Sequence, residues 1–209
     1  MKNSLLISVA VLGLVAVAVP SFADPADQPG HASPAPNTQD NTVSAVKDAA
    51  SVAVGTVTAE MTSTLSGFVN EAANSDMYEV EAAKIAEGRS RNPEVKEFAA
   101  KMITAHTGTS DELKSILREI GSDVAPPAHL DDRRQGLIDD LRGAKNSDFD
   151  GRYISQQVDV HREVLLLMQG YTQRGDVPQV KKFAAKTVPA VQSHLDMAEA
   201  MYRKMGLHS

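Results

Sequence analysis

A segment of eleven residues occurs twice in this chain, and each copy starts a long stretch of helical hydrophobic periodicity. "NPEVKEFAAKM" begins at Asn92 and "VPQVKKFAAKT" begins at Val177, an offset of 85 residues. In both copies a proline directly follows a turn, where its fixed φ suits the first residue of a helix. The repeat therefore predicts two copies of one unit, each a helical hairpin whose second helix opens with this segment.

Apolar residues at a 3.6-residue spacing indicate amphipathic helices over most of the chain after residue 64. The pattern predicts four long helices at 65–89, 93–120, 148–173 and 178–205, with a shorter helix at 131–142. Short connections join the long helices into two hairpins, and one longer crossover joins the hairpins. This order predicts an all-α fold, an up-down four-helix bundle built from two repeated helical hairpins with a short extra helix in the crossover.

Local signals place several of the helix ends. Asn92 before Pro93 is typical of an N-cap followed by proline at the first helical position, and Gly121 is typical of a helix stop. Ser147 and Asp150 resemble a capping box at the start of the third long helix. Pro189 lies inside the last helix, on the side away from its apolar stripe, where we expect it to tilt the half of the helix that follows.

The first 23 residues have the pattern of a secretory signal peptide. Lys2 gives a positive start, the apolar stretch "LLISVAVLGLVAVAV" follows, and "SFA" before Asp24 has the small-x-small form of a cleavage site. The apolar stretch is short for a membrane span, and no later segment is long and apolar enough for one. We therefore expect cleavage after Ala23, a periplasmic or secreted protein, and no integral membrane span in the mature chain.

The remaining chain divides by composition into three parts. Residues 24–62 are rich in Pro, Ala and polar residues or only weakly patterned, which predicts a disordered or weakly helical linker. Residues 63–206 carry the helical pattern and form the predicted bundle domain, and residues 207–209 form a tail.

The composition excludes several kinds of chemistry. The chain has no cysteine, so disulfides, thiolate metal ligands, cysteine nucleophiles and lipid attachment to a cysteine are all excluded. Its net charge is −6 at pH 7, with basic residues scattered among more numerous acidic ones, which argues against a nucleic-acid partner. The sequence leaves open which protein partner it has and whether it forms a homo-oligomer.

Five polar residues of metal-ligating types fall on the apolar stripes of the four long helices. The first helix contributes Asp76 and Glu79. The other three helices contribute, in chain order, His106, His161 and His194. Counted from the hairpin turns at 1.5 Å per residue, the five groups occupy a slab on the order of 10 Å thick. We expect them to meet inside the bundle.

Two interpretations fit such a layer. A single Zn, Cu, Fe or Ni ion held by the three imidazoles and by Asp76 or Glu79 suits imidazole-rich ligation. Alternatively, the two carboxylates pair with protonated imidazoles in a closed hydrogen-bond network that includes Gln157 and Thr109. Burying a carboxylate is strongly disfavoured unless a partner or a metal compensates its charge, so both interpretations require these groups to lie in contact.

Three stretches of the sequence stand out together: "SDMYEVEAAKIAEGRSRNPEVKEFAAKMITAHT", "YISQQVDVH" and "VKKFAAKTVPAVQSHLDMA". They resemble a group of bacterial exported proteins known as domain of unknown function 4142. The resemblance covers residues 65–205 and implies a ferritin-like four-helix bundle, in agreement with the helical pattern. It implies no established activity.

The resemblance to ferritin-like proteins does not extend to di-iron chemistry. Di-iron bundles carry Glu-x-x-His on two helices. In this chain an apolar residue, Ile103, Val158 or Val191, stands three positions before each histidine of the layer. The missing carboxylates argue against ferroxidase and di-iron oxygenase chemistry.

Three hypotheses about function follow. The first is a non-enzymatic exported bundle whose inner layer holds one metal ion, for envelope stress or metal handling. The second is a metal-free structural or interaction module whose buried polar layer only fixes helix packing. The third is a metalloenzyme, which would need an open coordination position and a cleft. The chain has no Ser-His-Asp order and no Gly-rich phosphate loop, so the third is least supported and no catalytic residue or organic cofactor site is assigned.

Overall fold

A computed structural model describes residues 62–207, and the structural statements below concern this part of the chain. The predicted signal peptide and nearly all of the predicted linker lie outside it. Its helices are α2 (Leu65–Arg89), α3 (Pro93–Glu119), α4 (Asp132–Gly143), α5 (Phe149–Arg174) and α6 (Pro178–Lys204). No strand occurs among the described residues, so the all-α prediction is confirmed there, and every predicted helix end is correct to within one residue.

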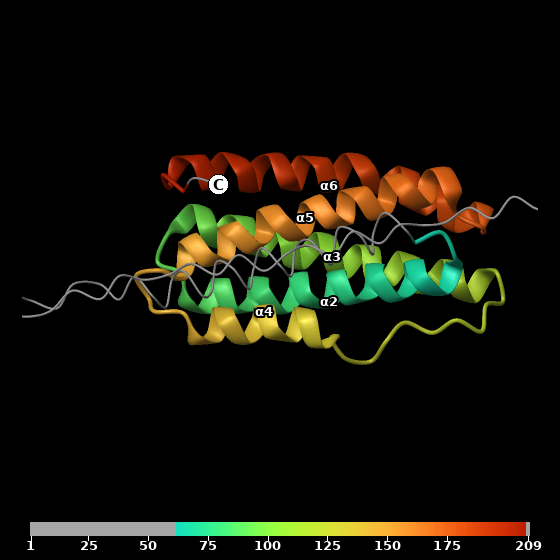
Figure 1. Cartoon of the computed structure of the whole chain (residues 1–209), viewed down its shortest axis with the longest axis horizontal. Coiled ribbons are helices and arrows are strands. Elements are labelled where there is room, and N and C mark those ends of the chain that lie inside the picture. Colours follow the sequence, from blue (N-terminus) through green and yellow to red (C-terminus); the bar gives the residue numbers. More distant parts are fainter. Residues whose placement is uncertain (1–61, 208–209) are drawn as a thin grey trace, which may run out of the picture. The chain divides into compact units, whose positions relative to one another are not determined.

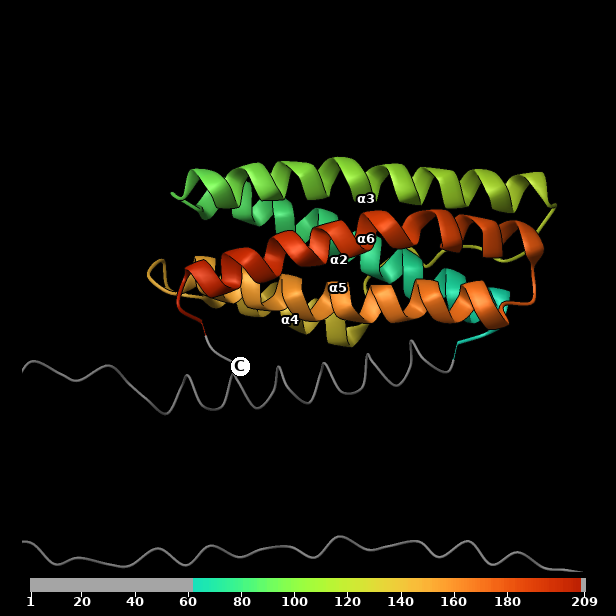
Figure 2. The same cartoon turned by 90° about the horizontal axis from the view of Figure 1, so that it is seen from above.

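Two short connections set the pairing of the long helices. Residues 90–92 join α2 to α3, and residues 175–177 join α5 to α6, so each pair runs antiparallel side by side (Figure 1). Contacts also join α2 to α5 and α3 to α6, while the short helix α4 packs against α2 and α5 (Figure 2). None of the helices in residues 62–207 combines the length and apolar character that crossing a bilayer requires.

Most of the predicted helix ends have the expected cause. The side chain of Asn92 accepts a hydrogen bond from the Glu94 amide at 2.9 Å, ahead of proline at the first helical position. Gly121 ends α3 with a φ of 64°, in the left-handed region that glycine enters without steric cost. The predicted capping box is wrong, because Asp148 is the N-cap of α5 and makes no side-chain cap. Ser147 instead donates its hydroxyl to the Asp148 carboxylate at 2.8 Å.

The core contains more aromatic surface than the composition suggested. Aromatic residues are only 4% of the chain, and this composition predicts a core of Ala, Val, Leu, Ile and Met. That expectation is wrong, because most aromatic side chains are buried: Phe68, Tyr78, Phe98, Phe149, Tyr153, Tyr171 and Phe183. Gly175 belongs to this packing, since a Cβ at that position would lie 2.5 Å from the ring of Tyr171.

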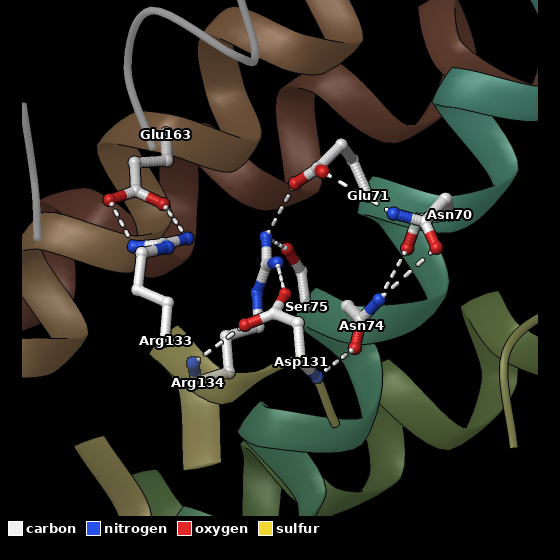
Figure 3. A network of polar contacts seen from close by, with 8 residues as sticks. All are labelled: Asn70, Glu71, Asn74, Ser75, Asp131, Arg133, Arg134 and Glu163. Carbon is white, nitrogen blue, oxygen red and sulfur yellow. Dashed lines mark hydrogen bonds and ion pairs between the residues drawn. The ribbon is translucent and has the colours of Figure 1, made fainter. Parts of the chain in front are cut away.

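A buried arginine fastens α4 to α2. Arg134 is 3% exposed, and its guanidinium contacts Glu71 at 3.0 Å and Ser75 at 2.9 Å, both on α2 (Figure 3). It also pairs with Asp131, whose carboxylate caps α4 by accepting from the Arg134 amide at 2.7 Å. One charged side chain therefore anchors both the start of α4 and its position on the neighbouring helix.

Two further contacts fix the same region. Arg133 forms a fork-to-fork pair with Glu163 of α5, with N–O distances of 3.0 and 2.7 Å (Figure 3). The amide of Asp131 donates to the side-chain oxygen of Asn74 on α2 at 2.9 Å. Bidentate arginine–carboxylate pairs fix direction as well as distance. The crossover is therefore held to both α2 and α5 by directional polar contacts.

Candidate metal centre

Three histidines from three helices meet inside the structure. His106 lies on α3, His161 on α5 and His194 on α6, and their exposed fractions are 3%, 1% and 8%. The ring centroids lie 5.5 to 5.7 Å apart, so the three rings form a nearly equilateral triangle. One ligand atom from each ring lies within 4.8 Å of the others. We call these three residues the histidine triad.

The apolar periodicity of the helices brings the triad together. Each histidine sits one turn from buried apolar residues of its own helix: Met102 on α3, Val158 and Val164 on α5, Val191 and Ala198 on α6. Residues three or four apart share a helix face. The same face that buries these side chains therefore points each imidazole toward the interior.

Asp76 determines which nitrogen of His106 is free. The Nδ1 atom of His106 lies 2.8 Å from Oδ1 of Asp76. That carboxylate also accepts hydrogen bonds from the hydroxyls of Thr109 and Ser110, each at 3.0 Å. A carboxylate accepts, so Nδ1 carries a proton, and in the neutral ring Nε2 keeps its lone pair. No side chain or backbone group in residues 62–207 hydrogen-bonds to this buried Nε2.

The carboxylates around His106 also raise its pKa. Burial alone would lower the pKa of the imidazole. The hydrogen bond to Asp76 and the negative charges of Glu79 and Asp76 act in the opposite direction and leave the pKa above its ordinary value. His106 is therefore the triad member that holds a proton most readily.

His161 has the same free nitrogen for a different reason. Its Nδ1 lies 2.8 Å from the backbone carbonyl oxygen of Gln157, which can only accept, so Nδ1–H is the donor. The Nε2 atom is buried and has no hydrogen-bond partner within the described residues. Burial, reinforced by the positive charge of His106, lowers the pKa of His161 well below its ordinary value. The ring is therefore neutral at pH 7.

His194 completes the triad from the side of α6. Its Nδ1 is buried and likewise finds no hydrogen-bond partner in residues 62–207. Burial lowers its pKa to about 4, and the charges of His106 and Lys101 act in the same direction. Each ring of the triad thus presents one buried nitrogen without a protein partner, and two of the three rings are neutral at pH 7.

Glu79 is the most deeply buried carboxylate of the layer. It is 0% exposed, and neither of its oxygens has a hydrogen-bond partner among the described residues. One oxygen lies 3.6 Å from Nδ1 of His161. Burial raises the pKa of Glu79 to about 7, although the positive charge of His106 opposes the shift. The side-chain amide of Gln157 and the hydroxyl of Tyr153 are also buried without partners.

The structure thus separates the five predicted site residues into two groups. The triad forms one cluster of mutually close ligand atoms. Asp76 and Glu79 lie behind it, against the Nδ1 atoms of His106 and His161. His129 is exposed, and His31 and His208 lie outside the described residues.

Two residues near the cluster were not identified as site residues from the sequence. Ser110 holds Asp76, and Tyr153 places an unpaired hydroxyl in the polar layer. Each had a usable signal: Ser110 stands one helical turn after His106, and Tyr153 interrupts an apolar stripe with a group that usually needs a partner when buried.

The donor set suits a borderline or soft transition metal. Imidazole nitrogens bind Zn, Cu, Fe and Ni, whereas Mg and Ca prefer oxygen ligands. At a metal–nitrogen distance of about 2.0–2.1 Å, three such donors lie about 3.3–3.6 Å from one another. The triad is within about 1.5 Å of that spacing, which side-chain torsions can supply. Three ligands leave a further coordination position unfilled by protein.

Solved structures share this fold. CopM in its Cu(II)-bound form matches with a TM-score of 0.58 at 18% identity, over 69% of this chain and 99% of that chain. CopM in its Cu(I)-bound form matches with a TM-score of 0.54 at 16% identity, over 72% and 96%. A DUF305 fragment from Deinococcus radiodurans matches with a TM-score of 0.58 at 12% identity, over 66% and 95%.

Sequence comparison gives one family. The family model described as "Domain of unknown function (DUF4142)" matches residues 35–201, which is most of the chain. A search of the curated proteins gave no significant match. The structural likenesses, all below 20% identity, show a shared fold and nothing further.

Proposed function

Since the chain belongs to the DUF4142 family, whose description assigns no activity, we propose from the site itself that the protein binds one transition-metal ion between His106, His161 and His194. The observation that carries this proposal is a cluster of three buried imidazoles, with one ligand nitrogen of each within 4.8 Å of the others, in which every ring has one buried nitrogen without a protein partner in the described chain. A metal ion supplies all three with a partner at once.

The alternative is a metal-free module in which the polar layer only fixes helix packing. Part of the layer favours it, because Asp76 is fully engaged by His106, Thr109 and Ser110. The triad itself does not, since each buried polar atom without a hydrogen bond costs about 1–3 kcal/mol. If these residues served packing alone, this destabilisation would occur three times within one cluster.

Copper is the metal we propose. Neutral imidazoles suit Cu, Zn, Fe and Ni, and among divalent first-row metals Cu(II) binds a given nitrogen site most tightly. The likeness to CopM, solved with Cu(II) and with Cu(I), supports the same choice. Zn, Fe and Ni remain the comparison metals in the test below.

In this proposal the two carboxylates support the metal ligands. Both oxygens of Asp76 are occupied by hydrogen bonds, so Asp76 orients His106 and keeps its Nε2 available. Metal-bound histidines usually donate their other N–H to a carboxylate or carbonyl in this way. Glu79 lies on the Nδ1 side of His161, where its negative charge offsets that of the bound cation.

We also propose the finer architecture and the location. The pairwise contacts of α2–α3, α5–α6, α2–α5 and α3–α6 close a ring, which supports an up-down, ferritin-like four-helix bundle. The pattern of residues 1–23 supports export. Together with the proposed metal site, export leads us to propose a role in metal handling or envelope stress without catalysis. An N-terminus at Asp24 in the protein recovered from the periplasm is the expected result, and an uncleaved chain in the cytoplasm would contradict export.

Metal titration of matched histidine variants tests the proposed site. Wild-type protein should bind one copper ion per chain, and His106→Ala should weaken the affinity by more than about 100-fold, beyond the effect of an outer hydrogen-bond partner. His129→Ala makes the same chemical change at an exposed loop residue and should bind as wild type. His194→Ala, at the least buried triad position, repeats the test should His106→Ala fail to fold.

The metal-free alternative predicts a different result. His106→Ala would then lower the free energy of unfolding by about 1–3 kcal/mol through its unpaired neighbours. That loss would be the same with and without chelator, and no variant would differ from wild type in copper binding.

A further inference from the structure

Three methionines form a line along α6 that begins beside the triad. Met197 follows His194 by three residues, and Met201 and Met205 follow at intervals of four. Side chains four apart on a helix lie on one face, about 6 Å apart along the axis. All three methionines are half-buried rather than enclosed in the core. We call them the methionine line.

The methionine line lies along the seam between α6 and the first half of α3. The sulfur of Met197 is 3.6 Å from the ammonium of Lys101 on α3. At the end of the helix, Met201 and Met205 line a cavity of about 250 Å³ together with Lys204 and residues 92–94 of α3. The line therefore joins a surface cavity at one end of the structure to the neighbourhood of the triad.

Of the three triad residues, His194 is the one that a metal ion moving along the methionine line would reach first. It is 8% exposed, against 3% for His106 and 1% for His161. It comes from the same helix as the methionine line and lies less than one turn before Met197. The positive charge of Lys101 also acts on its ring, which places the seam and the triad in electrostatic contact.

The chemistry of the methionine thioether determines which cation the methionine line can bind. Methionine sulfur is soft, polarisable and uncharged, and it binds Cu(I) where harder ions prefer imidazole, carboxylate or water. We propose that Cu(I) reaches the histidine triad along Met205, Met201 and Met197, entering at the cavity beside residues 92–94. The ion keeps its oxidation state along this route: each metal–sulfur bond breaks as the bond to the next methionine forms, and at Met197 the metal–sulfur bond is exchanged for metal–nitrogen bonds to the triad. This inference rests on the proposed copper site.

Lys101 lies across the inner end of this route. Its ammonium touches Met197 and its side chain is exposed, so it can swing away into solvent. A positive charge about 4 Å from the path opposes a passing cation by about 1 kcal/mol in water. Lys101→Gln should therefore speed loading by about fivefold, and Lys114→Gln, an exposed lysine further along α3, should not change it.

The rate of copper loading tests the proposed route independently of the proposed binding site. Met197, Met201 and Met205 are changed together to Leu, which keeps the volume and removes the sulfur, and Met77→Leu on α2 is the matched control. On mixing with a Cu(I)–chelator complex, the triple variant should load at least about tenfold more slowly than wild type or the control. Its equilibrium affinity should stay within about twofold, because the triad is intact.

The outcomes distinguish two failures. A triple variant that loads as fast as wild type overturns the route while leaving the copper site in place. Equal slowing by Met77→Leu also overturns it, since the effect would then follow from loss of any methionine. Wild-type protein that binds no copper overturns the proposed function and this inference together.

A second measurement detects contact with the line directly. In the His106→Ala variant the triad is disabled, and Ag(I) serves as a soft monovalent probe without redox chemistry. The methyl resonances of Met197, Met201 and Met205 should shift on adding Ag(I), and that of Met77 should not. Unshifted resonances of the methionine line would contradict the route even if loading rates differed.

Discussion

At the scale of single residues, the triad depends on which nitrogen of each ring is already engaged. Asp76 occupies Nδ1 of His106, and the backbone oxygen of Gln157 occupies Nδ1 of His161. In the neutral rings, both contacts leave Nε2 as the free lone pair. The low pKa values of His161 and His194 keep these rings unprotonated, so a metal does not compete with a proton for them at pH 7.

The first residue-scale prediction concerns Asp76. Asp76→Asn keeps the shape of the side chain but removes the charge that fixes the tautomer and raises the pKa of His106. Copper affinity should fall about 10–100-fold, the usual effect of losing an outer carboxylate partner. Asp139→Asn on α4, where the carboxylate is 63% exposed, is the control. Competition with a copper chelator measures both, and equal affinities would show that Asp76 does not support a ligand.

The second residue-scale prediction concerns acid stability of the metal-free protein. The pKa of His194 is about 4 in the folded state and 6.5 ordinarily, so between these values the unfolded chain binds more protons. Stability therefore falls as the pH falls from 6.5 to 4, and His161 acts in the same direction. Glu79 acts oppositely, because its folded pKa of about 7 exceeds 4.5 and its contribution to stability is lost as the pH rises through 7.

Melting temperatures across that pH window check these signs. His194→Gln should flatten the decline of the melting temperature between pH 6.5 and 4, and Glu79→Gln should steepen it. Two other charged or titratable groups act on His194: His106, whose pKa is raised, and Lys101. Both residues are present in both variants. A slope that is the same in wild type and His194→Gln would show that the ring is not held neutral in the folded state.

At the scale of elements, the helices were predictable because their signals are local. Apolar periodicity and the Asn92–Pro93 cap depend on neighbours within a few residues, and both predicted the structure correctly. The expected capping box failed because Asp148 has a φ of −107° and a ψ of −10°, whereas capping uses an extended residue. The burial of Arg134 was not predictable either, because its partner Glu71 is 63 residues away.

The element-scale prediction compares two arginines of α4. Arg134→Met leaves the partly buried carboxylate of Glu71 and the cap residue Asp131 without their buried partner, and should lower the free energy of unfolding by about 3 kcal/mol. Arg142→Met removes a 53% exposed arginine with two ion pairs and should cost less than about 1 kcal/mol. Urea denaturation measures both. Equal losses would mean that Arg134 does not anchor α4.

At the scale of the whole molecule, the convergence of the triad was predictable and the roles of its neighbours were not. Long helices joined by short turns place residues at a depth that can be counted from the turns, and this count predicts that the five residues lie in one layer. Whether a carboxylate faces a free or an engaged nitrogen depends on side-chain torsions, and these follow from packing across helices. Asp76 and Glu79 look like possible metal ligands in the sequence, and in the structure they lie against the Nδ1 atoms of His106 and His161.

The two copies of the internal repeat carry different residues at the site. Asp76 and His161 occupy equivalent positions of the two repeat copies, 85 residues apart, yet one orients a ring and the other belongs to the triad. The position equivalent to His106 is Val191. The second copy instead carries its histidine, His194, three residues later, which is about one helical turn. The two hairpins thus share a similar segment, while the residues that form the triad differ between them.

The most direct test of a metal-binding triad is the metal content of untagged mature protein purified from the periplasm, with thermal melts before and after chelation. A tag is avoided because its histidines would bind metal. The account predicts close to one copper per chain and a melting temperature that drops by about 5–10 °C on removal of the metal. Metal-free protein whose melting temperature does not change on adding copper, zinc, iron or nickel would contradict it and would leave the triad as part of a packing layer.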